Sequence, residues 1–444
     1  MTRIFPAYAY GDGPVAGCYW ATTVPDEPGA TPAATGKITA DVVIIGAGFT
    51  GLSAALHLAQ DGVDVVVLDS MYPGWGASGR NGGFCCLGGA KASSAELAHR
   101  FGQDALSGWR QAEQDAVALV ARLLQENDIA ADTHSQGETI LAHNDRAARE
   151  LRKDADRVKA DYAVDAKWHS PDALRDIGMA GPFTAGLTIP VGFALNPRKY
   201  VAGLVRAVLA AGARVHGHSA VTQIARNNNG FTLTTDQATV HASRLIVATN
   251  GYSSEDLPPW MAGRYLPAQS NVLVTRPLTQ AELDAAGWTS RQMAYDTRNL
   301  LHYFRLMPDN RFLFGMRGGL LASAKAEANI TARARHHFEQ MFPAWRNVET
   351  PHGWSGMVCF SSNRTPYCGP IPDMPGAFAG FAFHGNGVAM GSYAGALLAD
   401  LVQDRPTRLP YPKVMRAAAP RFPLGRFRRA LLPAGYALAG LRDI

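Results

Sequence analysis

Three glycines and an aspartate near the start of the chain have the types and spacing needed to bind a dinucleotide. The apolar run 41–45 leads into Gly46, and Gly48 and Gly51 complete the pattern Gly-x-Gly-x-x-Gly. In such a turn the first glycine lets the chain reverse tightly, the second lets a pyrophosphate approach the backbone, and the third brings the next helix close to the strand. Asp69 stands where a carboxylate would accept a hydrogen bond from a ribose hydroxyl.

Two further elements must position these residues. The run Val65-Val-Val-Leu68 predicts a second strand that ends at Asp69, and a helix is expected from about Thr50 to Asp61. The N-terminal N–H groups of that helix and its positive dipole end would face the phosphates. Because strand, glycines, helix and acid occur in one unit, a tight turn without a ligand is the minor alternative.

A second glycine-rich segment follows directly. Residues 72–84 contain five glycines in thirteen positions, which predicts a backbone surface packed against a flat group. Ser78, Arg80 and Asn81 could donate hydrogen bonds to a phosphate or to flavin carbonyls. A nicotinamide-binding domain would normally continue with more βα units at this point, so the segment favours a flavin.

Two later segments also favour a flavin. Residues 243–252 form a strand-like run, and residues 383–390 place glycines before a helix that is expected to continue to about Val402. Glycine turns at a helix N-terminus suit the negative charge that a reduced isoalloxazine develops. A nicotinamide-dependent dehydrogenase and a non-catalytic flavin-binding subunit are the alternatives.

The chain resembles the D-amino-acid oxidase/glycine oxidase superfamily of flavoproteins, and within it the γ-glutamylputrescine oxidoreductase group. The resemblance covers essentially the whole length. Its most specific motif is Gly76-Ala-Ser-Gly-Arg-Asn-Gly-Gly83, and Ala248-Thr-Asn-Gly-Tyr252 and Asn363-Arg-Thr-Pro366 also support it. The chain departs from the group at Asn386, where the group has a His between two glycines, and at Phe84, where a polar residue is frequent.

The resemblance implies a non-covalently bound FAD and a primary or secondary amine or amino-acid-like substrate, such as a γ-glutamylated polyamine. The substrate would lose a hydride to FAD, the imine would hydrolyse, and O2 or another acceptor would reoxidise the flavin. The flavin supplies the redox step, so no dedicated catalytic base is required. The residues expected to bind FAD are Gly46, Gly48, Phe49, Thr50, Gly51, Asp69, Ser70, Gly76, Ala77, Ser78, Arg80, Asn81, Gly82, Gly83, Val221, Thr249, Asn250, Gly251, Gly385, Asn386, Gly387, Val388 and Ala389.

Six side chains are candidates for contact with the substrate or the flavin edge, and most have a structural alternative. Tyr303 and Trp354 could equally be sheet or core aromatics. At least one of Arg305 and Arg317 is expected to be solvated or salt-bridged, and His384 could cap a helix. The candidates are Arg80, Tyr303, Arg305, Arg317, Trp354 and His384.

The expected fold is α/β, and α+β overall, with a Rossmann-like FAD-binding domain interleaved with an antiparallel-sheet substrate domain. Residues 93–127 are expected to form one helix, and 213–224 a strand whose backbone pairs with adenine, as the resemblance implies. Alternating runs at 300–305 and 311–315 predict a half-buried antiparallel sheet. The expected segments are an N-terminal arm (1–36), FAD-binding parts (37–127, 191–257 and 346–404), substrate-domain parts (128–190 and 258–345) and a basic C-terminal tail (405–444).

The composition fits a soluble enzyme of 444 residues, 47% hydrophobic and 18% charged. No apolar run approaches the ~20 residues needed to span a bilayer. The N-terminus does not resemble a secretory signal, so a cytoplasmic location is expected. The five cysteines fit no zinc spacing, so we expect reduced thiols and no metal site.

The basic character of the chain comes from its tail. Nine of the 42 Lys and Arg residues lie between Arg405 and Ile444, where Asp443 is the single acid. Such a tail could contact nucleic acid or a membrane surface, but the resemblance favours a segment that wraps the surface and pairs with acidic residues. No motif that reads nucleic acid is present, so no nucleic-acid partner is expected, and the sequence does not fix the oligomeric state.

Overall fold

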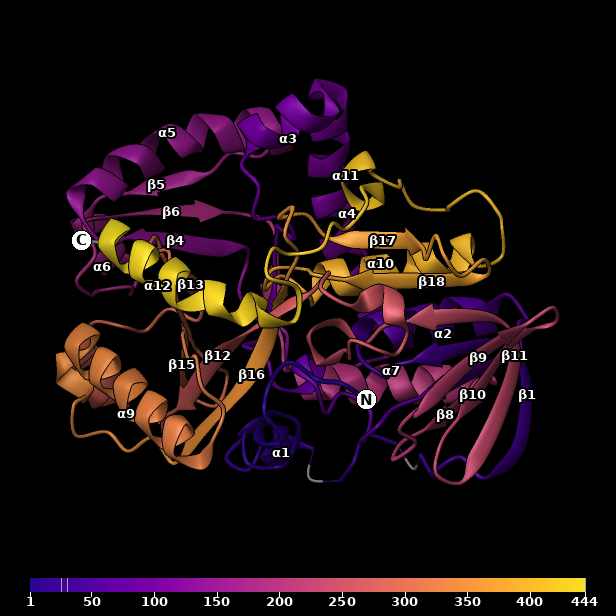
Figure 1. The fold of residues 1–444 in the computed structure, drawn as a ribbon. Helices are drawn as coiled ribbons and strands as arrows, with labels where there is room; N and C mark the ends of the chain where they lie inside the picture. Colours follow the sequence, from indigo (N-terminus) through magenta and orange to yellow (C-terminus); the bar gives the residue numbers. More distant parts are fainter. Residues whose placement is uncertain (25, 30, 444) are drawn as a thin grey trace.

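Two large β-sheets lie next to each other in the computed structural model, which describes residues 1–24, 26–29 and 31–443 (Figure 1). The first sheet has the order β17-β18-β11-β1-β2-β8, and a β9–β10 hairpin extends from β11. Its strands are β1 (Gly36–Ile45), β2 (Val65–Leu68), β8 (Arg214–His216), β9 (Gln223–Asn227), β10 (Gly230–Thr234), β11 (Ala238–Val247), β17 (Tyr367–Pro370) and β18 (Ala377–Phe381). The pairs β1–β2, β1–β11, β2–β8 and β11–β18 are parallel.

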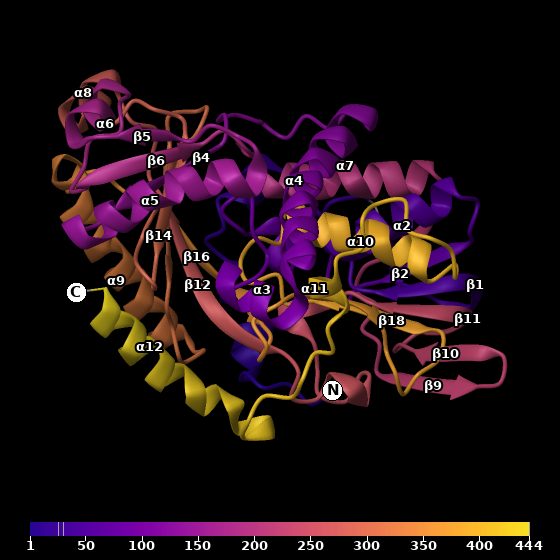
Figure 2. The same cartoon turned by 90° about the horizontal axis from the view of Figure 1, so that it is seen from above.

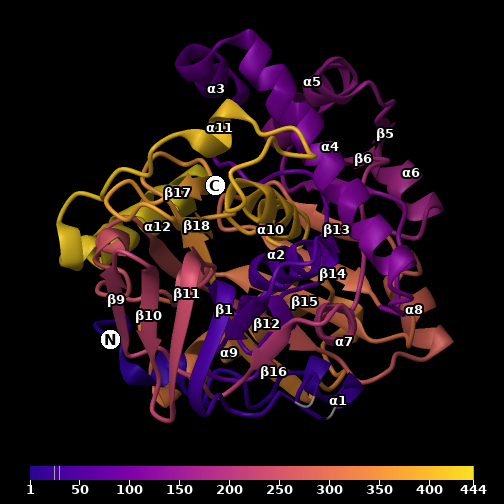
Figure 3. The same cartoon turned by 90° about the vertical axis from the view of Figure 1, so that its right-hand side faces the viewer.

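Alternate side chains of β1 enter two separate hydrophobic cores. Val42 and Ile44 pack on the side that carries the helices, whereas Val43 packs on the opposite side with Phe231 and Leu233 of the hairpin. Figure 3 shows helices on one side of β1 and the β9–β10 hairpin on the other. Burial on both faces explains why this strand reads as a continuous apolar run.

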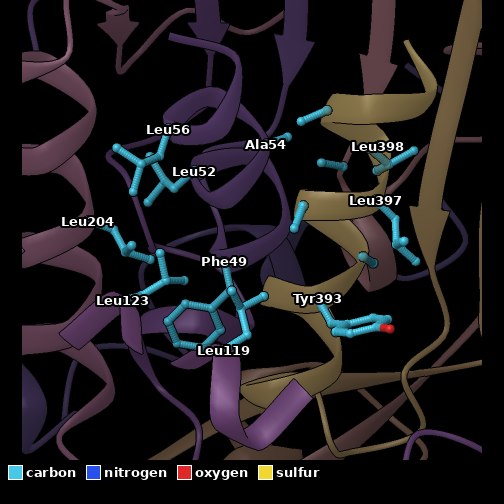
Figure 4. Close-up of a cluster of buried hydrophobic side chains, with 14 of the residues drawn as sticks. Phe49, Leu52, Ala54, Leu56, Leu119, Leu123, Leu204, Tyr393, Leu397 and Leu398 are labelled. Atoms are coloured by element: carbon cyan, nitrogen blue, oxygen red, sulfur yellow. The ribbon is translucent and has the colours of Figure 1, made fainter. Parts of the chain in front are cut away.

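Small residues let the helices on this sheet approach closely. They are α2 (Phe49–Gln60), α7 (Pro197–Ala210) and α10 (Ala389–Leu401). A Cβ on Gly395 of α10 would lie 2.4 Å from the carbonyl oxygen of Thr50 in α2, so only glycine fits there. In Figure 4, Leu119, Leu123 and Leu204 lie beside Phe49 of α2, and α10 packs on the other side of α2. The glycine turn before α2 is therefore held on a rigid base.

The segment 93–127 contains two helices, so the expectation of one helix is wrong. These helices are α3 (Ser94–Phe101) and α4 (Gln103–Glu126). Gly102 between them has φ +92°, a conformation that suits glycine and ends α3. The apolar periodicity continues across the break between the two helices, so the sequence pattern gave no sign of the break.

The expected strand at 213–224 is also largely wrong. Arg214–His216 forms β8 and Gln223 begins β9, but the chain between these two strands turns, with His218 at φ +48°. Ser219 N–H donates to the Asp69 carbonyl oxygen at 2.7 Å, and Thr222 N–H donates to the Thr234 carbonyl oxygen at 2.8 Å. Val221 therefore lies in an irregular crossing between two strands.

The second sheet has the order β16-β12-β15-β14-β13-β4-β6-β5. Its strands are β4 (Glu138–Ala142), β5 (Lys167–His169), β6 (Ala185–Ile189), β12 (Leu266–Val274), β13 (Met293–Asp296), β14 (His302–Leu306), β15 (Phe312–Arg317) and β16 (His352–Phe360). The expected antiparallel strands at 300–305 and 311–315 are confirmed by β14 and β15, but both strands are buried almost throughout, so the expectation of a half-buried sheet is wrong. Mixed α/β architecture with a Rossmann-like sheet is likewise confirmed.

One segment boundary requires correction. β16 lies within 346–404, which was expected to belong to the FAD-binding domain, but it pairs along its whole length with β12 of the second sheet. The expected boundary after Trp345 coincides with the end of the 3₁₀ turn Pro343–Trp345, and the chain then returns to the same sheet. Because β12 and β16 are far apart in the sequence, no local sequence pattern indicates that they pair.

Strand β14 presents alternate residues to two different surroundings. Phe304 packs in an aromatic core beneath α9 (Ala324–Met341), together with Phe312 and Phe338. Tyr303 and Arg305, one residue to either side, point to the opposite face because side chains alternate along a strand. That face is turned toward the glycine-rich segment, since a Cβ on Gly82 would lie 2.7 Å from the Tyr303 ring.

The C-terminal tail wraps over both sheets (Figures 1 and 2). Arg405 and Arg408 pair with the buried Asp400 at 2.6 and 2.9 Å, and Arg428 pairs with Glu255 at 2.6 Å. Three of the tail arginines therefore pair with acids, as a wrapping segment requires. Within the described residues, no helix is long and apolar enough to cross a membrane.

The remaining elements are short or peripheral. They are α1 (Trp20–Thr23), α5 (Asp145–Tyr162), α6 (Pro171–Asp176), α8 (Gln280–Ala286), α11 (Lys413–Arg416), α12 (Leu431–Arg442) and the strand pair β3 (Phe84–Cys85) and β7 (Phe193–Ala194).

Candidate functional site

A cavity of about 640 Å³ is lined by residues from both sheets. Its volume lies within the ~300–1,000 Å³ typical of cofactor and ligand sites. It runs past the glycine turn before α2, the segment 72–84 and the turn before α10. The predicted site residues that line it are Gly46, Gly48, Phe49, Thr50, Asp69, Ser70, Gly76, Ala77, Ser78, Arg80, Asn81, Gly82, Val221, Thr249, Asn250, Tyr303, Arg317, His384, Gly385, Asn386, Gly387 and Val388.

The turn between β1 and α2 has the close approaches that its glycines predict. Gly46 has φ +106°, and a Cβ there would lie 2.8 Å from the Ala248 carbonyl oxygen. A Cβ on Gly51 would lie 1.9 Å from the Gly46 carbonyl oxygen, so this glycine permits the helix to pack on the turn. Gly48 caps α2 without a side-chain hydrogen bond, which leaves the positive end of the helix facing the cavity.

Asp69 is held rigidly at the end of β2. Its Oδ2 accepts a hydrogen bond from Ala47 N–H at 2.7 Å, and its Oδ1 accepts one from Met71 N–H at 2.9 Å. Burial raises the pKa of this carboxyl, while the two N–H donors act against that rise. Each oxygen of a carboxylate can accept a second hydrogen bond, so Asp69 retains acceptor capacity on the cavity wall.

Val221 presents its backbone to the same end of the cavity. Across residues 1–24, 26–29 and 31–443, neither its N–H nor its carbonyl oxygen bonds to another backbone group. Such free main-chain groups could pair with the edge of an adenine. The irregular crossing at this position therefore leaves the main-chain groups of Val221 without backbone partners among the described residues.

The glycine-rich segment uses most of its polar side chains to hold itself. Ser78 Oγ accepts from Phe49 N–H at 2.9 Å, which ties the segment to α2. The amide of Asn81 donates to the carbonyl oxygens of Ala77 and Ser78, and its Oδ1 accepts from Gly83 N–H. Asn81 lines the cavity but has no free amide hydrogen, so its expected role as a donor to the cofactor is wrong.

Arg80 keeps one free donor. Its Nε donates to the Gly76 carbonyl oxygen at 3.1 Å, and Nη1 donates to the Ser355 carbonyl oxygen at 3.2 Å. The guanidinium lies over the Trp75 ring at 4.4 Å, and 3% of the residue is exposed. The buried Nη2 has no hydrogen-bond partner among the described residues. An orphaned cationic donor on the cavity wall fits an anionic or carbonyl-bearing ligand.

The turn before α10 joins both halves of the cavity. His384 is buried and precedes Gly385, which has φ +108°. His384 Nδ1 lies 2.8 Å from the Gly89 carbonyl oxygen, and Nε2 lies 3.3 Å from Ser361 N–H. This pattern makes Nδ1 the donor and Nε2 an acceptor. Burial, with further effects of nearby cations such as Lys91, lowers the pKa of His384 to about 3, so the ring is neutral.

Asn386 is also occupied by the protein. Its amide donates to the Leu87 carbonyl oxygen at 2.5 Å and lies 3.4 Å from Cys86 Sγ. A Cβ on Gly88 would lie 2.5 Å from the same amide nitrogen. Asn386 therefore fastens the turn to the segment 86–88 and replaces a titratable His by a non-titrating amide.

Tyr303 and Arg317 line the part of the cavity formed by the second sheet. The Tyr303 hydroxyl lies 3.0 Å from Ser270 Oγ, and its ring fills the space left by Gly315, where a Cβ would lie 2.1 Å from it. Arg317 donates to the His384 carbonyl oxygen at 3.1 Å. Both residues are therefore positioned to contact a ligand that enters between the sheets.

Two of the substrate candidates lie elsewhere, so their expected contact with the substrate is wrong. Arg305 is buried and donates to the Leu195 carbonyl oxygen at 2.8 Å, with His134 Nε2 at 3.0 Å. It is neither solvated nor, among the described residues, salt-bridged. Trp354 packs with Trp20 in the core and donates to the Arg80 carbonyl oxygen at 2.7 Å. The alternation of side chains along a strand does not show whether a residue reaches the cavity or is buried in the core.

Four predicted cofactor residues do not line the cavity. Each is a glycine or alanine, and Gly51 and Gly83 give space to protein atoms. A Cβ on Gly83, for instance, would lie 2.0 Å from the Leu195 carbonyl oxygen. The four are Gly51, Gly83, Gly251 and Ala389.

Sequence reasoning missed three charged residues on the cavity wall, Arg3, Lys91 and Glu138. Lys91 follows the glycine-rich region and is exposed, and the nearby Arg317 lowers the pKa of its side chain. Glu138 begins β4, and burial raises its pKa to about 7. The feature of the sequence that could have identified Glu138 is a single acid directly before the run Thr139-Ile-Leu-Ala142.

The residues present fit a dinucleotide that carries a flat ring system. Glycines shape the walls at both helix N-termini, Asp69 and Val221 offer hydrogen-bonding groups at one end, and Arg80 offers an unpaired donor. Residues 41–401 match the family described as FAD dependent oxidoreductase, abbreviated DAO. The match includes every part of the chain that lines the cavity except Met1, Arg3 and Tyr10.

Named relatives are similar over nearly the full length. The chain is 29% identical to a probable oxidoreductase, OrdL, of Rhizobium meliloti, over 96% of this chain and 97% of that protein. It is also 29% identical to gamma-glutamylputrescine oxidoreductase of Escherichia coli, over 92% of this chain and 93% of the relative.

Solved structures share the fold. Glycine oxidase from Geobacillus kaustophilus superposes with a TM-score of 0.68 at 19% identity, over 84% of this chain and 96% of the other. Iminodiacetate oxidase from Chelativorans sp. BNC1 gives 0.69 at 20% identity, over 85% of this chain and 100% of the other. The prediction of an FAD-dependent oxidoreductase is confirmed: the chain belongs to the DAO family of FAD-dependent oxidoreductases.

Proposed function

We propose that this protein oxidises a C–N bond of an amine or amino-acid-like substrate to an imine, which water then converts to a carbonyl product. The observation that supports this most directly is a single cavity that joins the dinucleotide turn to the charged wall of the second sheet. The full-length similarity to gamma-glutamylputrescine oxidoreductase supports an amine as the substrate class.

The first sheet would hold FAD without a covalent bond. The turn at Gly46 and Gly48 with the N-terminus of α2 would receive the pyrophosphate, Asp69 the ribose and Val221 the adenine edge. The segment 76–82 and the turn before α10 would enclose the ring system. The remaining expected FAD residues, Gly51 and Gly83 among them, would act by shaping these walls.

The second sheet would hold the amine against the ring. Bound FAD supplies a two-electron acceptor for the substrate C–H bond. Tyr303 and Arg317 would orient the substrate, and the buried side chains around them would exclude water from the reacting carbon. His384 would remain neutral throughout and would keep the Arg317 side chain in place through its backbone carbonyl oxygen.

A neutral amine needs no side-chain base for hydride loss, so the absence of a free imidazole is compatible with this role. We also propose O2 as the final electron acceptor. The alternative acceptors are a quinone or a second protein, and an oxygen electrode with a reducing amine would distinguish them.

An anaerobic spectral screen tests the proposal. The FAD-loaded protein is mixed with putrescine, a γ-glutamylated putrescine, N-methylated amino acids and D-amino acids, and the visible flavin absorbance is followed. We expect at least one of these amines to bleach the flavin. Bound FAD that none of these compounds reduces would favour a non-catalytic flavin-binding subunit.

A further inference from the structure

Glu138 is a buried acid on the cavity wall that lacks a cationic partner. It is 3% exposed, and it lies on β4 opposite Met293 and Ile189 of the neighbouring strands. Its carboxyl group accepts a hydrogen bond from the Cys86 thiol. Within the described part of the chain, no Lys, Arg or His forms an ion pair with it.

The charged groups near Glu138 do not offset the cost of burying its carboxylate. Glu113 carries the same charge and disfavours ionisation of Glu138. Glu113 has its own cation, Arg110, at 2.8 Å and accepts a further hydrogen bond from the Tyr162 hydroxyl at 2.7 Å. Arg110 is thus already engaged. A buried carboxylate without a partner is costly, so its retention on a cavity wall indicates a ligand that supplies the missing charge.

The opposite charge is found on another part of the same cavity. Arg317 and Lys91 both line it, and neither forms an ion pair among the described residues. Arg317 lowers the pKa of Lys91 because the two cations are close to each other. The cavity therefore has an acidic wall at Glu138 and a basic wall at Arg317 and Lys91.

The acidic wall adjoins the turn before α10. Cys86 contacts Glu138 and lies 3.4 Å from the amide nitrogen of Asn386. Tyr295 lines the cavity at the same place and interacts electrostatically with Glu138. Since the proposed function puts the flavin ring at this turn, Glu138 lies on the substrate side of the cavity.

We infer that Glu138 binds an amine group of the substrate that stays cationic and is distinct from the neutral amine that is oxidised, and that Arg317 and Lys91 bind an anionic group of the same molecule. The inference rests on the proposed function for the reaction, but it concerns which ligands the cavity accepts. A ligand that uses both walls then carries a cation and an anion far enough apart to reach Glu138 at one end and Arg317 at the other. Monoamines without an anionic group would bind weakly.

Paired ligand probes test this assignment in the FAD-loaded protein under anaerobic conditions. Putrescine is the cationic probe and butyrate the anionic probe, and binding is measured by calorimetry and by perturbation of the flavin spectrum. Glu138→Gln keeps the shape and removes the charge. We expect this substitution to lower the affinity for putrescine by about 30-fold or more, as the loss of one partner of a buried charge pair does. The affinity for butyrate should change by no more than about threefold.

Arg317→Met is the matched opposite variant. It should lower the affinity for butyrate and leave the affinity for putrescine unchanged. Glu138→Asp keeps the charge and should restore part of the putrescine affinity that the Gln variant loses. Folding is checked by the retained flavin spectrum of each variant. Putrescine affinity that is unchanged in Glu138→Gln would overturn the inference.

The outcomes separate this inference from the proposed reaction. If no amine reduces the flavin but putrescine binding depends on Glu138, the reaction is wrong and the inference holds. If amines reduce the flavin equally well in the wild-type protein and in Glu138→Gln, with equal affinities, the inference is wrong and the reaction holds.

Discussion

The Arg317 guanidinium donates a hydrogen bond to the backbone carbonyl oxygen of His384 at 3.1 Å, and this contact fastens the second sheet to the turn that precedes α10. Close packing supports it, because a Cβ on Gly385 would lie 2.3 Å from Arg317 Nη2. The two halves of the cavity are therefore aligned through a backbone atom, and the imidazole of His384 is not needed for this contact.

His384→Gln should change the rate of anaerobic flavin reduction by a good amine substrate no more than a few-fold. The wild-type ring is neutral, with a pKa of about 3, and both nitrogens already contact Gly89 and Ser361. Stopped-flow absorbance measures the rate. A loss of about 10²-fold with normal FAD binding would instead make His384 a working acid or base.

The same pKa predicts a pH effect on stability. The folded-state pKa of His384 lies below its ordinary value of 6.5, so the folded protein resists protonation. Stability should therefore fall as the pH is lowered from about 6.5 toward 3, and His384→Gln should show a smaller fall. Urea unfolding of the two proteins at pH 7 and pH 5 compares them. Equal falls would show that His384 is protonated in the fold.

Asp69→Ala should weaken FAD binding at least tenfold. The substitution removes the proposed acceptor of the ribose hydroxyl, at a cost of roughly 1.5–3 kcal/mol, and also the ties to Ala47 and Met71 N–H. Titration of the apoprotein with FAD by fluorescence measures this. Asp64→Ala is the control, because that exposed acid pairs with Arg214 at the far end of β2. Unchanged affinity in Asp69→Ala would mean that the ribose lies elsewhere.

FAD should be released intact by acid precipitation. Cys86 and Cys359 both line the cavity, but burial raises the pKa of the Cys359 thiol to about 12 and that of Cys86 well above its ordinary range. A protonated thiol is a poor nucleophile toward the ring. Mass spectrometry of the pellet should find unmodified peptides for both cysteines, and colour retained in the pellet would contradict the prediction.

Glu138→Gln should stabilise the apoprotein above neutral pH. The folded-state pKa of Glu138, about 7, exceeds its ordinary 4.5, so wild-type stability falls as the pH rises through this interval and stays low above it. The free energy of unfolding should rise on the order of 3 kcal/mol at pH 8 and change little at pH 4.5. Chemical denaturation at the two pH values measures it. Glu150→Gln, at an exposed acid, should show no such gain.

The sequence by itself determined the dinucleotide turn, the flavin-type loop and the FAD-dependent oxidoreductase family. These features are local: Gly46, Gly48 and Gly51 lie within six residues, and the backbone conformations they allow are those that a phosphate site needs. The antiparallel pair β14–β15 was also predictable, because alternation over five residues is a local pattern.

Tertiary structure alone decided which polar side chains remain free. Arg305 lies behind Trp20 and Phe84, and Trp354 packs in the core, although both have plausible chemistry in the sequence. Hydrogen-bond partners such as the Leu195 carbonyl oxygen are more than a hundred residues away, so no local pattern records them.

The charged walls were hidden for the same reason. Glu138 and Arg317 belong to strands that are far apart in the chain and reach one cavity only through the pairing of β4, β13, β14 and β15. Whether a buried charge is a structural ion pair or a ligand-binding group depends on the neighbours that the fold supplies, and among the described residues none forms an ion pair with Glu138.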